Sequence, residues 1–373
     1  MKSKVYFASA RVRKWNHDDS LPGKLTRLLG HMGLAGRYTK GEWVAVKTHF
    51  GSEGAHRIVR PVFLRKVTDA LREAGCKPFV TDTVRIKGLD YLEVANMNGI
   101  NHLSVGAPVI LADGIYGRDN ILVDAEGLGQ VAIASAIHDA PAMVVVSHVK
   151  GHINAGYAGA IKNLAMGGVS GSHRHCGWKC GRGAMHSIGH GKLTWDKDKC
   201  AFCMQCQEVC PLECLEVNEA AGTLTYSDET CWRCGRCTRV CPEGALTHEG
   251  VDESSFMAGL AAAAKAVLGT FSKGKVIYVN CITEVQPECD CMPGADVPVV
   301  QDQGIMVSDD LVAIEQACMD MLSRALPLPQ SAAEDCGAKP DVLYAVNARN
   351  ASVQTEEAER LGLGSRAYEL IEI

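Results

Sequence analysis

The chain has 373 residues, 47% of them hydrophobic, and a formal net charge of -5. This length is more than a single small core needs and is enough for two packed units. Ordinary apolar content and mild charge exclude a disordered tail, a nucleic-acid-binding arm and a membrane-surface patch. The N-terminal sequence MKSKVYFASARVRKW lacks the apolar core of an export signal, and no stretch reaches the about 18 apolar residues of a membrane helix. We therefore expect a cytoplasmic protein with no membrane span and no nucleic-acid partner.

Most of the chain alternates short apolar runs with amphipathic segments, which predicts an α/β fold with a mostly parallel sheet and helices on both faces. The clearest helix covers 61–75, with Pro61 in its first turn and Gly75 as its stop. In chain order, the predicted strands are 5–8, 43–48, 78–81, 109–112, 142–147 and 276–279, and the other predicted helices are 129–138, 254–269, 308–325 and 353–364. Residues 368–373 could add a terminal strand.

Small, polar and ionisable residues follow the predicted strands. They are His49, Gly51, Asp82, Thr83, Asp113, Gly114, His148, Lys150, His152, Asn154, Asn280 and Cys281. Each alone can be turn chemistry, but ligands of open α/β sheets bind beyond the carboxyl ends of the strands. We therefore expect a site at this edge. Lys150, His152 and His148 are its candidate proton donors, and Lys162 with Asn163 could hold a small anionic substrate.

The longest continuous signal near this edge is SHVKGHINAGYAGAIKNLAMGG, residues 147–168. Its glycines would let backbone amides approach an anion. It fits neither the phosphate-loop spacing nor the dinucleotide fingerprint, so the sequence gives no support for nucleotide binding. A glycine-rich helix packed closely on its neighbours would explain the glycines but not the two lysines.

A duplicated cysteine motif carries the strongest chemical signal. The sequence KCAFCMQCQEVC at 199–210 is repeated 31 residues later as TCWRCGRCTRVC at 230–241, and each copy spells C-x2-C-x2-C-x3-C-P. This spacing is typical of [4Fe-4S] clusters, where the fourth cysteine of one copy serves the cluster of the other. The predicted ligands are Cys200, Cys203, Cys206 and Cys241 for one cluster, and Cys231, Cys234, Cys237 and Cys210 for the second. Pro211 and Pro242 would end the two ligand loops.

Two alternatives to the paired clusters are less consistent with the sequence. Zinc ribbons pair two separated C-x2-C units rather than three cysteines in register. Disulfides are disfavoured by the odd count of 17 cysteines and by their clustering. Cys214 falls opposite Ala245 in the repeat and is expected to be a small packing residue. The stretch between the motifs predicts a hairpin with Gly222 at its turn.

Cysteines outside the motif suggest a third metal site. Cys289 and Cys291 flank one aspartate, and Cys281 begins the same loop after a predicted strand. These three are the candidate ligands of an additional metal or cluster. The alternative is a pair of reduced, partly buried thiols. A second group places Cys176 and Cys180 near several histidines, namely His173, His175, His186 and His190, whereas Cys76 and Cys318 are expected to pack in the core.

Several segments resemble the "domain of unknown function 362" iron–sulfur-centre family. They are KTHFG (47–51), RPVFLRKV (60–67), KPFVTDT (77–83), APVILADG (107–114), VAIASAI (131–137), SHVKGH and GAIKNLAMG (147–167), CDC with VPVVQDQGIMVSDD (289–310) and LGLGSRAYELIEI (361–373). The resemblance implies this domain fused to a bacterial-type two-cluster ferredoxin, and it implies no particular reaction. The stretch HRHCGWKCG (173–181) departs from the family pattern, so a role for its cysteines would be particular to this branch.

The predicted organisation is an α/β domain over 1–191 and 251–326, an inserted α+β ferredoxin-like domain over 192–250 and a C-terminal extension over 327–373 packing on the α/β domain. The leading hypothesis is an iron–sulfur redox protein that relays electrons from a redox partner protein to a reductive site at the strand ends. One alternative is a non-catalytic electron carrier or adaptor for a partner oxidoreductase, which predicts a closed, apolar strand-end edge. Another is a metal-dependent non-redox enzyme with a structural ferredoxin module.

Overall fold

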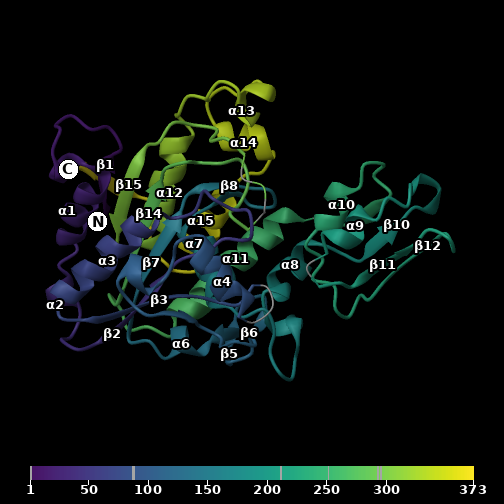
Figure 1. The fold of residues 1–373 in the computed structure, drawn as a ribbon, viewed down its shortest axis with the longest axis horizontal. Coiled ribbons are helices and arrows are strands. Elements are labelled where there is room, and N and C mark those ends of the chain that lie inside the picture. The colour runs from purple at the N-terminus through teal and green to yellow at the C-terminus, as the bar shows by residue number, and fades with distance from the viewer. Residues whose placement is uncertain (1, 86–88, 211, 251, 292–293, 295) are drawn as a thin grey trace.

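The centre of the protein is an eight-stranded mixed sheet in the order β16–β1–β15–β14–β7–β2–β3–β4 (Figure 1). This computed structural model describes residues 2–85, 89–210, 212–250, 252–291, 294 and 296–373, so Pro211 lies outside the described residues. The strands are β1 (Ser3–Ser9), β2 (Trp43–Lys47), β3 (Lys77–Asp82), β4 (Val109–Leu111), β7 (Ala142–His148), β14 (Val276–Ile282), β15 (Gly304–Ser308) and β16 (Tyr368–Glu372). Only β15 runs against its neighbours β1 and β14, so the prediction of a mostly parallel sheet is confirmed.

Helices cover both faces of this sheet, as predicted. Successive residues of a strand point to opposite faces, and in β7 Val144 belongs to one apolar core while Val145 belongs to the other. The first face packs against α1 (Leu21–Gly30), α3 (Pro61–Glu73) and α4 (Asp90–Met97). The second packs against α7 (Ala160–Gly168), α11 (Glu253–Leu268), α12 (Leu311–Leu322) and α15 (Ser352–Arg360). The central strands are therefore buried on both sides.

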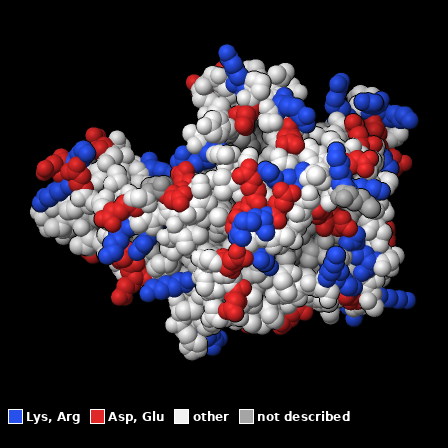
Figure 2. Space-filling model, turned by 180° about the vertical axis from the view of Figure 1, so that it is seen from behind, with Lys and Arg blue, Asp and Glu red and all other residues white. Residues whose placement is uncertain are grey.

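Shorter helices connect these elements. They are the 3-10 turns η1 (His17–Asp19), η2 (Trp178–Cys180) and η3 (Lys197–Lys199), with α2 (Leu34–Arg37), α5 (His102–Val105), α6 (Ser135–His138), α8 (Gly183–Gly189), α9 (Gln205–Glu208), α10 (Arg236–Val240), α13 (Ala332–Asp335) and α14 (Val342–Asn347). Among the described residues, none of the helices has the length and apolar character needed to span a bilayer. Acidic and basic side chains are interspersed over the face shown in Figure 2.

The helix predicted at 129–138 is wrong. Most of this stretch is strand β6 (Gly129–Ala134), which pairs with β5 (Asn120–Ala125), and only its end forms α6. Val131 and Ile133 lie opposite Val123 and Ile121, and such β-branched cross-strand pairs favour a hairpin. A short apolar run does not distinguish strand from helix by periodicity alone. The helix predicted at 308–325 begins later, where Asp310 accepts a hydrogen bond from the backbone N–H of Ala313.

The cysteine-rich segment, residues 192–250, lies at one end of the molecule (Figure 1). It contains two small antiparallel pairs, β10 (Leu193–Trp195) with β13 (Leu246–His248) and β11 (Leu215–Asn218) with β12 (Thr223–Tyr226), around its own apolar cluster. Gly222 has φ of +60° at the turn between β11 and β12, which confirms the predicted hairpin. The C-terminal strand β16 instead pairs with β1 and completes the main sheet.

The backbone of the cysteine-rich segment repeats with the period of its cysteines. Helices α9 and α10 begin at Gln205 and Arg236, which are 31 residues apart. The same spacing relates the positive-φ residues Phe202, Met204 and Glu213 to Arg233, Gly235 and Gly244. Residues other than glycine rarely adopt positive φ, so its recurrence at corresponding positions indicates two copies of one tight loop.

Candidate functional site

The first cysteine set lines a single pocket. Cys200, Cys203, Cys206 and Cys241 surround it together with apolar side chains, and Ala245 closes part of its wall. The backbone N–H of Ala245 donates to the sulfur of Cys241 over 3.2 Å. Three cysteines of one copy and the last cysteine of the other are thus brought together, as the crosswise ligand set requires.

The second set comprises Cys210, Cys231, Cys234 and Cys237, and its thiols are close enough to influence one another's charge. Burial raises the pKa of Cys237 to about 12, and the other three thiols of the set add to the shift. The backbone N–H of Arg233 donates to the Cys231 sulfur over 3.3 Å. Cys214 is half-buried, with its sulfur 3.4 Å from that of Cys210, and therefore borders this set as Ala245 borders the first.

The second copy of the motif also contacts the main domain. Arg239, on α10, donates to Oδ1 of Asn154 over 2.7 Å and to the carbonyl of Ile153 over 3.2 Å. These two residues lie in the loop between β8 (Lys150–His152) and β9 (Gly156–Ala158). The cysteine-rich segment is therefore attached directly to the loop that follows His152.

Asp290 organises one half of the strand-end edge. It is 1% exposed, and its carboxylate lies 2.8 Å from Nζ of Lys150, 2.8 Å from Nδ1 of His148 and 2.8 Å from Nε2 of Gln286. Burial alone would raise the pKa of Asp290, but Lys150 and His148 outweigh burial and hold it well below its usual range. Nε2 of His148 also donates to the carbonyl of Thr283 over 2.9 Å. Two of the predicted proton donors are thus engaged in fixing Asp290, to which sequence analysis gave no role.

A second buried carboxylate, Asp82, organises the other half. Nζ of Lys47 lies 2.9 Å from Oδ1, while Nδ1 of His49 at 3.0 Å and the Tyr91 hydroxyl at 2.6 Å approach Oδ2. Burial would raise the pKa of Asp82, but Lys47 and His49 lower it overall. Lys47 also donates to Oδ1 of Asn163 over 2.6 Å. Asn163 is therefore bound by Lys47, which ends the otherwise apolar strand β2.

Helix α7 carries Lys162 and Asn163 and is held at its start by Glu315. This fully buried carboxylate accepts hydrogen bonds from the backbone N–H groups of Ala160 at 2.8 Å and Ile161 at 3.0 Å. Burial raises the pKa of Glu315, although these hydrogen bonds oppose the rise. Its only sequence signal is an acidic residue on the apolar side of a predicted helix, and sequence analysis missed it.

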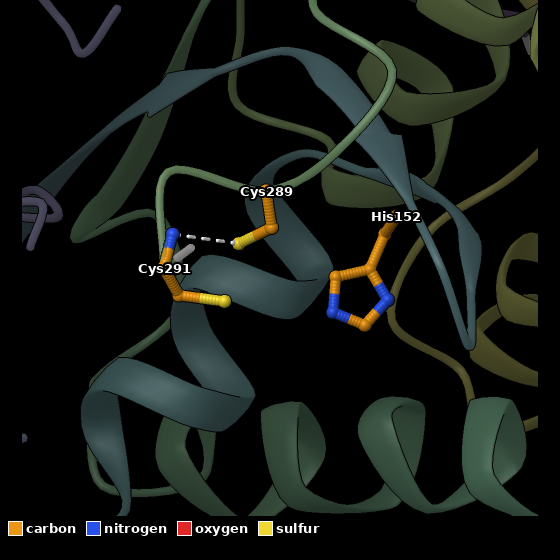
Figure 3. Close-up of side chains that lie close together, drawn as sticks. All are labelled: His152, Cys289 and Cys291. Atoms are coloured by element: carbon orange, nitrogen blue, oxygen red, sulfur yellow. Dashed lines mark hydrogen bonds between the residues drawn. The ribbon is translucent and has the colours of Figure 1, made fainter. Parts of the chain in front are cut away.

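Lys162 faces the two cysteines that flank Asp290. Its Nζ lies 2.9 Å from the sulfur of Cys289, and this contact and Cys291 raise the pKa of Lys162 although burial alone would lower it. His152 completes the group in Figure 3: one ligand atom from each of His152, Cys289 and Cys291 lies within 4.8 Å of the others. By distance, the group could hold a metal ion.

Cys281 does not belong to this group. Its side chain is buried in the apolar core on the first face of the sheet, among residues such as Val279 and Ile305. Of the three cysteines predicted for a third metal site, Cys289 and Cys291 are therefore brought together with His152, whereas Cys281 lies in the apolar core. Cys76 and Cys318 are buried, as predicted for packing residues, and Cys336 is exposed.

Cys176 and Cys180 form a disulfide, which corrects the expectation that all cysteines are reduced thiols. Nδ1 of His173 lies 3.3 Å from the Cys176 sulfur. Two histidines predicted to lie near this pair are engaged elsewhere: His186 stacks on Phe256 and His190 lies beside His248.

The strand-end edge as a whole is buried but polar. Several of its buried side-chain atoms have no hydrogen-bond partner among the described residues, including Oγ1 of Thr48, Nε2 of His49, Oγ1 of Thr83 and Oδ2 of Asp113. Buried polar groups normally have partners, and exceptions concentrate at functional sites. This edge differs from the closed apolar surface expected of a mere adaptor.

The fold and the cysteine sets define a cysteine-rich α/β protein with a polar strand-end site. The family described as "Domain of unknown function (DUF362)" matches residues 44–320, and the chain belongs to this family. The comparison with curated proteins gave no match.

Several solved structures are similar to the chain. The lactate racemase apoprotein from Thermoanaerobacterium thermosaccharolyticum is 11% identical with a TM-score of 0.42, and the alignment covers 100% of this chain and 83% of that one. A protein from Thermotoga maritima is 11% identical with a TM-score of 0.40, covering 81% of this chain and 58% of that one. Likenesses at this level carry no argument about function.

Proposed function

We propose that the protein is an iron–sulfur redox protein that binds two [4Fe-4S] clusters and directs electrons to the strand-end site. Cys200, Cys203, Cys206 and Cys241 would hold one cluster, and Cys231, Cys234, Cys237 and Cys210 the second. The single observation that carries the proposal is the pocket lined by the first set, because it joins cysteines from both copies of the motif. Residues 192–250 would then be a ferredoxin-like domain inserted between 1–191 and 251–326.

The residues of the pocket fit such a group. Four thiols converge on a pocket whose remaining wall is largely apolar, and a backbone N–H is directed at one of the sulfurs. Thiolate ligands, an apolar wall and N–H donors to sulfur are the features by which proteins hold and tune these clusters. When bound, the clusters supply one-electron transfer.

The attachment of the cysteine-rich segment favours delivery into the main domain. Arg239 is on the helix that carries Cys237, and it contacts the loop directly after His152. The edge reached in this way is polar, with buried carboxylates, lysines and unpartnered atoms. We therefore place the reductive site at this edge and expect electrons to come from a redox partner protein in the cytoplasm.

Within that site the side chains divide into two roles. His148 and Lys150 position the loop around Asp290, and Asn163 positions Lys47. His152 and Lys162 face the two sulfurs and are the residues proposed to hold and move protons or to bind a small anionic substrate. Burial lowers the pKa of His152 well below 6.5, so its imidazole stays neutral at physiological pH.

The test is anaerobic purification followed by iron and sulfide analysis and electron paramagnetic resonance of the reduced protein. We expect about eight irons and eight sulfides per chain. The Cys336→Ala variant is the matched control, because this exposed thiol lies outside both sets and its loss should leave the iron content unchanged. A colourless protein, or one with two zinc ions and no sulfide, would contradict the proposal.

A further inference from the structure

The loop Cys289–Asp290–Cys291 is fixed rather than free. The carboxylate of Asp290 is bound by Lys150, His148 and Gln286, and the hydroxyl of Ser52 donates to its backbone carbonyl over 3.1 Å. The two cysteines on either side of this anchored residue cannot move far apart, and their sulfurs lie within 4.8 Å of each other. Figure 3 shows both sulfurs facing the same space as the His152 ring.

The sulfurs of Cys289 and Cys291 are placed to share one negative charge. The Cys289 sulfur accepts hydrogen bonds from the ammonium of Lys162 over 2.9 Å and from the backbone N–H of Cys291 over 3.3 Å. The hydrogen bond between the two cysteine side chains raises the pKa of Cys289 and lowers that of Cys291 well below its usual range. A buried cation and an N–H donor both stabilise a thiolate over a thiol. The pair is thus poised as one thiol and one thiolate.

The tautomer of His152 decides what this pair can do. Nδ1 accepts hydrogen bonds from the backbone N–H groups of Asn154 and Ala155, both over 3.1 Å. The proton of the neutral ring is therefore on Nε2, which is the nitrogen that faces the sulfurs in Figure 3. A histidine that binds a metal directs a nitrogen lone pair at the metal and donates the N–H of its other nitrogen to the surrounding protein. In His152 the N–H faces the sulfurs and the lone pair of the other nitrogen faces the backbone. Two thiols alone are too few ligands for a closed zinc site.

We propose that Cys289 and Cys291 form a redox-active dithiol, a two-electron centre that exchanges electrons with the one-electron iron–sulfur carriers of the same chain. The disulfide takes up two electrons, delivered one at a time, and one proton; its S–S bond breaks and one thiol and one thiolate form. Oxidation reverses this step and returns both electrons and the proton. The inference rests on the proposed function for its electron source.

The surrounding residues support this chemistry. Lys162 stabilises the thiolate of the reduced pair, and Nε2–H of His152 donates a hydrogen bond toward the sulfurs. Asp290 is a positioning residue that keeps the two cysteines on one side of the loop. The dithiol would also collect single electrons from the one-electron carriers and deliver two electrons to a substrate that needs both.

The first test traps thiols with an alkylating reagent after anaerobic oxidation by diamide, and reads the modified peptides by mass spectrometry. We expect Cys289 and Cys291 to resist alkylation under denaturing conditions after oxidation and to become reactive again after dithiothreitol. Cys281 and Cys318 are the matched controls because both are buried and belong to neither cysteine set. Two freely alkylated thiols after oxidation, or a zinc ion released on alkylation, would overturn the inference.

A variant separates this inference from the proposed function. Cys289→Ser with Cys291→Ser should lose the reversible couple and keep about eight irons. If the wild-type chain has its full iron content but shows no reversible dithiol–disulfide couple, only the dithiol proposal is refuted. If the chain shows the couple but contains no iron, the proposed electron source is refuted, and with it the proposed exchange of electrons.

The second test measures the potential of the couple in dithiothreitol redox buffers. Removing the ammonium in Lys162→Met destabilises the reduced pair, so we expect the equilibrium to shift about tenfold, or about 30 mV, toward more negative potential. Lys199→Met, at an exposed lysine of the cysteine-rich segment, is the control that should leave the potential unchanged. An unchanged potential in the Lys162 variant would contradict the role given to this residue.

Discussion

The guanidinium of Arg239 donates a hydrogen bond to Oδ1 of Asn154 over 2.7 Å, and this contact attaches the cysteine-rich segment to the loop after His152. The two residues are 85 positions apart in the chain. Hydrogen bonds to a charged group contribute about 1.5–3 kcal/mol when both partners are held in place. The contact therefore stabilises the strand-end loop from outside the main domain.

Arg239→Ala should loosen this loop without removing iron. We expect hydrogen exchange at the amides of residues 153–155 to become about tenfold faster or more, because opening the loop no longer breaks this contact. Mass-spectrometric exchange and iron analysis of the same sample measure both effects. Lys199→Ala, which removes only an exposed ion pair with Asp196, should change neither quantity. Unchanged protection in the Arg239 variant would show that the segment does not order the loop.

Double variants can establish the crosswise ligand sets. If Cys203 and Cys241 serve the same cluster, the variant with both replaced by alanine should keep about four irons, while Cys203→Ala with Cys210→Ala should keep almost none. If each copy of the motif held its own cluster, the two results would be exchanged. Iron and sulfide analysis of the two anaerobic samples, side by side, decides between these outcomes.

Gly167 is the position where a single methyl group should displace the Lys47–Asp82 pair. A Cβ there would overlap the ammonium of Lys47 and lie 2.9 Å from Oδ1 of Asp82. We expect Gly167→Ala to lower the free energy of unfolding by about 1–3 kcal/mol, as overpacking does in a buried site. Denaturant unfolding measures this change. Gly30→Ala is the matched control, because its Cβ would meet no atom within 4 Å and should be neutral or slightly stabilising.

Asp113 should give the stability a distinct pH dependence. Burial raises its pKa from 3.8 to about 6, although Arg182 opposes the rise. The folded protein therefore binds this proton more tightly than the unfolded chain does, and the stability contributed by Asp113 falls as the pH rises from about 4 to about 6 and is level above that range. The melting temperature of Asp113→Asn should lack this fall. The difference between the two proteins corresponds to at most about 3 kcal/mol, and a constant difference from pH 4 to 7 would contradict the shift.

The alternation of apolar runs with amphipathic segments was sufficient to predict the α/β class, because it reports a local periodicity. All six strands predicted at the sequence level exist, and helix α3 begins at Pro61 as expected. Strand β15 was missed, since its short apolar run was assigned to no element and the predicted helix began only at 308. The helix predicted at 129–138 was wrong because a few buried residues in a row are compatible with either structure.

The residues of the candidate site were also predicted only in part from the sequence. The sequence predicted that polar residues would meet at the strand ends, and His49, Asp82, His148 and Lys150 do lie there. It gave no role to Asp290, whose partner Lys150 is 140 positions away, and it grouped Cys281 with Cys289 although the two lie in different surroundings. Which side chains become neighbours across such distances depends on strand order and on which face of a strand a residue occupies.

By itself, the sequence determined the two repeats of the cysteine motif and the polar character of the strand ends, because ligand spacing and periodicity are properties of a few consecutive residues. Only the tertiary structure decided that His152, Lys162 and two cysteines share one buried space, and that the proton of His152 is directed at the sulfurs. The physical reason is that a loop, a helix and a hairpin must pack together before these groups can fix one another's charge.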